Sequence, residues 1–257
     1  MTRLRLYLRL LRLFAVLGEG ALYAGWVGLR ECLGGAPMEL RQQLTCRFMG
    51  HLRNALPLKV EIRGQLPDAP ALWLANHVSW VDIAVLGALR PLSFLAKAEV
   101  GRWPLAGWLA RQAGTLFIRR GAGDSLAIGR QLAEQLQQGR HLAIFPEGTS
   151  SDGSDVLRFH ARLLAAAVDS GVAVQPVAIR YRRDGQRDPL APFIGDDELP
   201  EHLLRLFAAE RATVEITLLA PIASQGLSRS ELARRSQAAI AAVVCAEKQP
   251  AAIREAA

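Results

Sequence analysis

A histidine and an aspartate five residues apart, His77 and Asp82, carry the clearest chemical signal in the chain. They follow an apolar run at Leu72–Ala75, which predicts a strand, and the aspartate lies in a helical pattern at Val81–Leu89. In open α/β sheets, functional sites gather where strands end and helices begin. An imidazole acts as a general base when a carboxylate bonds its other ring nitrogen and stabilises the imidazolium. The spacing therefore predicts a His–Asp general-base pair.

The pair works only in a particular local structure. Five residues of an ideal α-helix rotate by about 500°, which leaves the two side chains roughly 140° apart. His77 must therefore lie in the turn before the helix and Asp82 inside its first turn. An alternative is a helix capping box, in which Ser79 is the N-cap and Asp82 binds only backbone N–H groups. The heptapeptide by itself leaves both interpretations open.

A second polar stretch follows the predicted strand His141–Phe145. Glu147, Gly148 and Thr149 place a carboxylate and a hydroxyl at a glycine turn, where backbone can approach a ligand closely. The alternative is an ordinary exit from a strand, with the glutamate in solvent.

These residues require an α/β scaffold, and the pattern from residue 56 onward predicts one. Short apolar runs alternate with helical stretches, which is typical of a mixed, mostly buried sheet flanked by helices. The expected strands are Leu58–Arg63, Leu72–Ala75, Leu92–Ala96, Thr115–Arg119, His141–Phe145, Val172–Tyr181 and Thr213–Leu219. The expected helices are Val81–Leu89, Ser125–Gln138, Leu157–Ser170 and Ser230–Glu247, and Arg182–Pro200 is expected to be a surface excursion. We take residues 56–257 as one catalytic domain.

Residues 1–55 have a different character, and we expect them to form membrane-associated helices. Arginines recur at helical spacing before an almost uncharged run, Leu13–Leu29. A second, basic amphipathic segment follows a Gly-Gly-Ala-Pro break, and such helices suit the headgroup layer. The first helix is short for a span of about 20 apolar residues, so spanning and one-leaflet insertion both remain open. The alternative is that both helices only pack on the main domain.

The amino-acid composition limits the classes of binding partner that we expect. Lys and Arg number 31 against 24 Asp and Glu, a formal net charge of +7. Such an excess suits nucleic acid, anionic lipid or an acidic carrier protein. Aromatic residues make up only 6% and no nucleic-acid-binding motif is present, so we expect no nucleic-acid partner. The basic residues beside an apolar segment favour lipid.

The cysteines and histidines do not predict a metal site. Cys32, Cys46 and Cys245 are widely spaced and odd in number, which indicates neither a disulfide framework nor a metal cluster. The five histidines are dispersed, and none has zinc-ligand spacing. We therefore expect no metal, and a reducing, cytoplasmic-side location fits the free thiols.

Taken together and in order, several blocks resemble the glycerolipid acyltransferase family, which includes the 1-acylglycerol-3-phosphate acyltransferases. The blocks are Asn76–Asp82, Phe94–Glu99, Gly114–Arg120, Phe145–Thr149 and Val174–Ile179. They span about residues 72–181, so the resemblance covers most of the expected α/β domain.

The resemblance implies a reaction and a role for each matching residue. His77 deprotonates the acceptor hydroxyl, and Asp82 orients the imidazole of His77. Lys97 and Arg120 match basic positions around the acceptor's phosphate, and the acceptor-site turn is Glu147, Gly148 and Thr149. The acyl donor is a thioester, either acyl carrier protein or acyl-CoA, with no further cofactor. We expect the inner membrane, with the active site facing the cytoplasm, because the arginines before the apolar segment favour a cytoplasmic N-terminus if the first helix spans.

One departure bears on the acceptor. Phosphate-handling members of the family carry arginine after Glu-Gly-Thr, whereas this chain has Ser150 there and Asp152 two residues later. The change removes a bidentate phosphate clamp and adds negative charge. The run resembles the branch that acylates lyso-ornithine lipid, so we favour that lysolipid over 1-acylglycerol-3-phosphate as acceptor. Arg119 and Arg120 still offer cationic contacts, and Arg158 is a further candidate for such a contact.

Two rival functions remain to be weighed. A serine hydrolase built on Ser79 is disfavoured because the Gly-x-Ser-x-Gly elbow is absent. A catalytically idle lipid-binding protein of the same fold is the other alternative, since fold does not imply function. Retention of both His77 and Asp82 favours catalysis.

Overall fold

The computed structural model describes residues 2–119 and 125–246. Its helices are α1 (Thr2–Cys32), α2 (Met38–Ala55), α3 (Val81–Gly87), α4 (Pro104–Gln112), α5 (Ser125–Gln137), α6 (Ala165–Ser170), α7 (Leu199–Ala208) and α8 (Arg229–Val244). Its strands are β1 (Leu58–Arg63), β2 (Leu72–Ala75), β3 (Ser93–Lys97), β4 (Leu116–Ile118), β5 (Leu142–Ile144), β6 (Val174–Arg183), β7 (Gln186–Arg187) and β8 (Ala212–Leu218). Short 3₁₀ turns cover Val100–Arg102 and Ala161–Leu164.

The strands form one mixed sheet, in the order β1-β8-β6-β2-β5-β3-β4, with β7 paired to the end of β6. β2 runs parallel to both β5 and β6, and β3 runs parallel to β5 and β4. β8 is antiparallel to β6, while β1 is parallel to β8. The predicted mixed α/β fold is confirmed. The carboxyl ends of β2, β5, β3, β4 and β6 consequently meet at one edge of the sheet.

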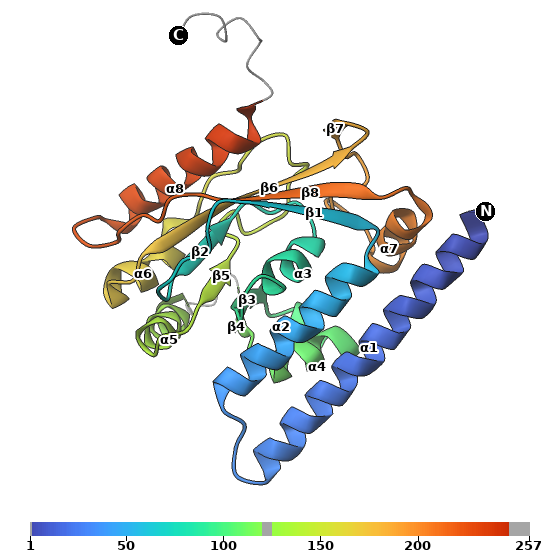
Figure 1. The fold of residues 1–257 in the computed structure, drawn as a ribbon. Coiled ribbons are helices and arrows are strands. Elements are labelled where there is room, and N and C mark those ends of the chain that lie inside the picture. The colour runs from blue at the N-terminus through green and yellow to red at the C-terminus, as the bar shows by residue number, and fades with distance from the viewer. Residues whose placement is uncertain (1, 120–124, 247–257) are drawn as a thin grey trace, which may run out of the picture.

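Helices cover both faces of this sheet (Figure 1). Successive residues of the central strand β2 face opposite sides, as the period of a strand requires. Leu72 and Leu74 join a core cluster with α5, α6 and α8, whereas Trp73 and Ala75 join a cluster with α3 and α7. Every residue of β2 is buried, because a central parallel strand is covered from both sides.

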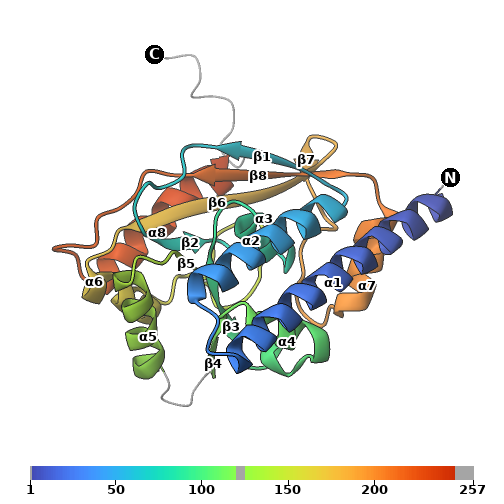
Figure 2. The same cartoon turned by 60° about the horizontal axis from the view of Figure 1, so that its bottom comes forward.

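The two N-terminal helices form an antiparallel hairpin on one side of the molecule (Figure 2). α1 also packs against α4 and α7, so the hairpin rests on the sheet domain. The helices approach closely at Gly20, where an added Cβ would lie 2.5 Å from the ring of Phe48. Residues Arg3–Cys32 are long and apolar enough to cross a membrane, by length and composition.

The predicted helix Leu157–Ser170 is wrong at its start. The chain is irregular until the 3₁₀ turn at Ala161, and α6 begins only at Ala165. Backbone groups in this segment bond the polar turn after β5: Leu157 donates its N–H to Glu147, and His160 donates its N–H to the carbonyl of Pro146. Tertiary hydrogen bonds have replaced helical ones here. α4 and α7 are further helices beyond those expected from the pattern.

Candidate active site

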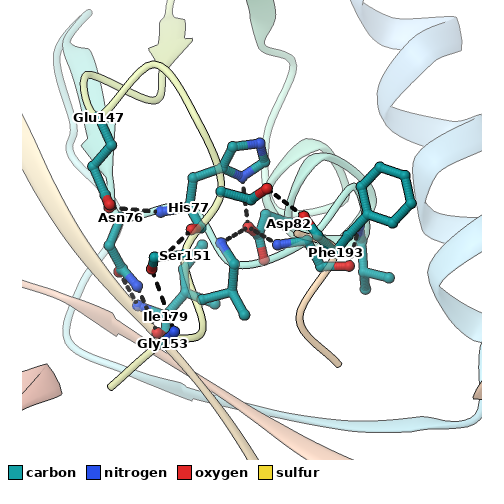
Figure 3. Close-up of polar contacts among 12 residues, drawn as sticks. Asn76, His77, Asp82, Glu147, Ser151, Gly153, Ile179 and Phe193 are labelled. Atoms are coloured by element: carbon teal, nitrogen blue, oxygen red, sulfur yellow. Dashed lines mark hydrogen bonds and ion pairs between the residues drawn. The ribbon is translucent and has the colours of Figure 1, made fainter. Parts of the chain in front are cut away.

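His77 and Asp82 meet in the geometry that the spacing requires. β2 ends at Ala75, His77 lies in the following turn, and Asp82 is the second residue of α3. The imidazole Nδ1 lies 2.8 Å from Asp82 Oδ2 (Figure 3). Because the turn lets the chain fold back on itself, the two side chains face each other despite their unfavourable helical spacing.

The same carboxylate also accepts hydrogen bonds from the backbone. Asp82 Oδ2 accepts the N–H groups of Val78 at 2.8 Å and Ser79 at 2.9 Å. Asp82 is fully buried. Capping and imidazole orientation are therefore not alternatives, because one side chain performs both. The hydroxyl of Ser79 is also fully buried and accepts only from the N–H of Val81, at 3.4 Å. It makes no hydrogen bond with His77, so the geometry offers no support for a serine nucleophile.

Tyr181 completes the surroundings of the aspartate. Its hydroxyl donates to Asp82 Oδ1 at 2.6 Å. β6 pairs with β2 up to Val177 opposite Ala75, so Tyr181 extends four residues beyond that pair, toward the turn. Burial, followed by the negative charge of Asp82, raises the pKa of Tyr181 well above its ordinary value of 10.0, which keeps the hydroxyl a donor. No local sequence signal marks this residue, because it lies 99 residues from its partner.

Tyr181→Phe tests this positioning role. The variant leaves one oxygen of a buried carboxylate without its donor, which costs about 1–3 kcal/mol of stability. We expect kcat to fall by about tenfold with KM unchanged, because the imidazole is less firmly oriented. Steady-state kinetics and urea unfolding measure both effects, and Tyr23→Phe in α1 is the matched control. A stability loss with full turnover would assign Tyr181 a purely structural role.

The imidazole itself is clamped by the loop after β5. The ring of Phe145 stacks on that of His77, with centroids 4.0 Å apart and an interplanar angle of 17°. The backbone N–H of Ser151 donates to the His77 carbonyl at 2.8 Å. The His77 side chain is 20% exposed, and no hydrogen bond from the described part of the chain reaches Nε2. This nitrogen is therefore available to a substrate hydroxyl.

Glu147 is buried against the turn that carries His77 rather than lying in solvent. Its Oε1 accepts the N–H of His77 at 2.9 Å and its Oε2 accepts the N–H of Leu157 at 3.1 Å. The residue is only 4% exposed, so the interpretation of a solvated glutamate is wrong. Burial raises its pKa from 4.5 to about 7, against the lowering effect of the two N–H donors. Glu147 thus joins the β2 turn to the β5 loop.

The raised pKa predicts a pH dependence of stability. The pKa of the Glu147 carboxyl is about 7 in the folded protein and 4.5 as its ordinary value. The contribution of this group to the free energy of unfolding is therefore fully present below pH 4.5. That contribution is lost as the pH rises through about 7. Glu147→Gln should remove roughly 3 kcal/mol of pH dependence between pH 4.5 and 8. Urea unfolding of both proteins across this range measures the difference, and parallel curves would contradict the prediction.

Three other predicted site residues occupy the same edge of the sheet. Lys97 is the exposed last residue of β3 and pairs in register with Ile118 of β4. Gly148 has a φ of 69°, which favours glycine, and Thr149 is exposed. Arg120 lies outside the described residues. Among the residues of the described ranges, no group of three or more His, Cys, Asp or Glu side chains is placed to hold a metal ion.

The polar run after Thr149 is held by its own contacts. Ser150 donates its hydroxyl to the carbonyl of Phe193. Asp152 forms an ion pair with Arg187 at 3.1 Å and accepts the N–H of Ser154 at 2.9 Å. Ser150, where the resemblance leads us to expect an arginine in phosphate-handling members, is therefore a short side chain bonded to a neighbouring loop.

Several known acyltransferases resemble this chain. The acyltransferase family model matches residues 57–180. A lyso-ornithine lipid O-acyltransferase from Pseudomonas aeruginosa is 57% identical over 100% of both chains. A 1-acyl-sn-glycerol-3-phosphate acyltransferase from Neisseria gonorrhoeae is 34% identical over 84% of this chain and 86% of the relative. A Rhodobacter capsulatus lyso-ornithine lipid O-acyltransferase is 37% identical over 72% of this chain and 70% of the relative.

The fold also matches a solved structure. The crystal structure of the 1-acyl-sn-glycerophosphate acyltransferase from Thermotoga maritima superposes with a TM-score of 0.71. The match covers 97% of this chain and 99% of that one, at 24% identity. The N-terminal helices are therefore part of the shared architecture.

Proposed function

Because the chain belongs to the acyltransferase family, we propose that it transfers a fatty acyl group from a thioester carrier to a hydroxyl of a lysolipid. The observation that carries the mechanism is the 2.8 Å contact between His77 Nδ1 and Asp82, with Nε2 left for the substrate. The donor is acyl carrier protein or acyl-CoA. Both are anionic, which suits a chain with a net charge of +7.

The proposed reaction uses Nε2 of His77 as the proton acceptor. His77 Nε2 takes the proton of the acceptor hydroxyl as the oxygen attacks the thioester carbonyl. The negative charge of Asp82 stabilises the imidazolium that forms. When the tetrahedral intermediate collapses, the C–S bond breaks and the imidazolium returns its proton to the leaving thiolate. The acyl group passes directly to the acceptor, and the carrier is released as a thiol.

Lyso-ornithine lipid is the acceptor that we propose. The relative that matches the full length of the chain bears that activity in its name. Ser150 and Asp152 stand where a phosphate clamp would require positive charge, and a phosphorus-free acceptor does not need that clamp. 1-Acylglycerol-3-phosphate is the second candidate, favoured by the Neisseria relative.

A direct comparison of acceptors tests this choice. Purified protein receives lyso-ornithine lipid and lysophosphatidate in parallel, with labelled acyl carrier protein as donor. We expect lyso-ornithine lipid to be preferred, and Ser150→Arg to shift the ratio of kcat/KM values about tenfold toward lysophosphatidate. Ser150→Ala is the control, because it removes the hydroxyl without adding charge. Preference of the unmodified protein for lysophosphatidate would refute the assignment.

We place the active site at the cytoplasmic surface of the inner membrane, with α1 inserted in one leaflet. Large apolar side chains remain exposed along one stripe of this helix. They are Leu4, Tyr7, Leu8, Leu11, Phe14, Leu22, Trp26 and Leu29. The opposite stripe packs on α2, α4 and α7, so the helix lies against the domain along its length. A helix with one packed face and one apolar face suits the interface better than an isolated span. Binding to uncharged vesicles, included in the experiment below, tests this placement.

A further inference from the structure

A groove lined by arginines lies where the beginning of α1 meets the end of α2 and the starts of β1 and β8. Its lining includes Arg5, Arg9, Arg12 and Arg211, together with Leu4 and Leu8. The groove has a cavity volume of about 340 Å³. None of the predicted catalytic or acceptor-site residues that the structure describes lines it.

Two of the arginines are fixed by the neighbouring helix α7. Arg9 Nη1 donates to the carbonyls of Phe207 and Ala209, each at 2.6 Å. Arg5 forms an ion pair with Glu210. The carbonyls lie at the C-terminal end of α7, where cations are favoured. The side chains of Arg5 and Arg9 are therefore held in place without a bound ligand.

The other two arginines leave positive charge unbalanced. Arg12 and Arg211 are exposed, and neither forms a hydrogen bond or ion pair through its side chain with the rest of the described chain. Burial lowers the pKa of Arg9, and the like charges of Arg5 and Arg211 lower it further. Such a concentration of one charge sign attracts an anion.

The rim of the groove is apolar and continues the exposed stripe of α1. Leu4 is 67% exposed and Leu8 58% exposed. The groove lies at the same edge of the sheet as the turn that carries His77, because β8 begins beside the end of β6, with Thr213 opposite Arg182. Three strand spacings, or about 14 Å, separate β1 from β2. A ligand here would hold that edge at the headgroup layer.

We propose that this groove binds the phosphate of an anionic phospholipid, whose acyl chains lie against Leu4 and Leu8. Guanidinium groups bind phosphate oxygens through charge-assisted hydrogen bonds. The volume suits a headgroup rather than the surface of a carrier protein. The inference rests on the membrane placement proposed above but not on the identity of the acceptor.

Vesicle binding by the full chain tests the site. Flotation with phosphatidylcholine vesicles is compared with flotation with vesicles that also contain phosphatidylglycerol. Arg12→Ala/Arg211→Ala should weaken binding to the anionic vesicles by about 10- to 30-fold and leave binding to uncharged vesicles unchanged. Arg63→Ala/Arg229→Ala is the matched control, because it removes the same charge from exposed positions away from the groove, and it should retain most of the preference. Circular dichroism confirms that each variant is folded.

Several results would overturn the proposal. An equal loss in the control variant would show a response to net charge alone. Unchanged vesicle binding with a raised KM for acyl carrier protein would make the groove a carrier-docking surface. Calorimetric binding of inorganic phosphate without any vesicle preference would indicate a site for free phosphate. Turnover of the unmodified protein in detergent is measured separately, so failure of the proposed function is distinguishable from failure of this site.

Discussion

His77→Ala is expected to lower kcat by about 10³-fold or more while membrane association is retained. Nε2 is the ring nitrogen left for the acceptor hydroxyl, and no other described imidazole shares the contacts with Asp82 and Phe145. Alanine removes the proton acceptor without removing the carboxylate or the loop that surrounds it. Radiolabelled acyl transfer under saturating substrates measures kcat, and vesicle flotation measures membrane association.

Two control variants sharpen this result. His160→Ala removes an exposed histidine outside the pair and should retain turnover. Ser79→Ala should also retain substantial turnover, whereas a serine nucleophile could not be replaced. Unchanged transfer by the His77 variant would end the general-base mechanism. Absence of transfer by the unmodified protein would favour the catalytically idle alternative.

Asp82→Asn is expected to lower kcat by about 10²- to 10⁴-fold with a much smaller loss of stability. The amide oxygen can still accept from the N–H groups of Val78 and Ser79, which now bond Oδ2. The amide nitrogen then faces Tyr181, whose hydroxyl can rotate to accept rather than donate. The fold is thereby kept, but the negative charge that stabilises the imidazolium is lost.

The separation of the two effects is the decisive measurement for Asp82→Asn. Steady-state kinetics give kcat, and urea unfolding gives the free energy of unfolding for the same preparation. Asp197→Asn, which removes a surface carboxylate paired with Arg205, is the matched control and should change neither quantity strongly. If turnover fell only in proportion to the folded fraction, Asp82 would be a capping residue and nothing more.

The local parts of the fold could be predicted because their signals are local. Buried strands show apolar runs, and the turn at His77 followed by α3 is visible in the order of apolar and polar residues. The prediction that a helix begins at Leu157 was wrong for a physical reason. Its backbone N–H bonds Glu147, which lies ten residues away in sequence and belongs to another element. A propensity pattern does not contain that competing hydrogen bond.

The amino-acid sequence alone determined the pairing of His77 with Asp82, because an imidazole, a carboxylate five residues later and the turn between them are all local, and short-range geometry depends on adjacent residues. The tertiary structure decided what surrounds that pair. Tyr181 reaches Asp82 from 99 residues away because β6 extends past the end of β2. Arg211 joins the arginines of α1 because β8 begins where that helix begins. Such contacts depend on strand order and register, which arise only when the whole sheet is packed.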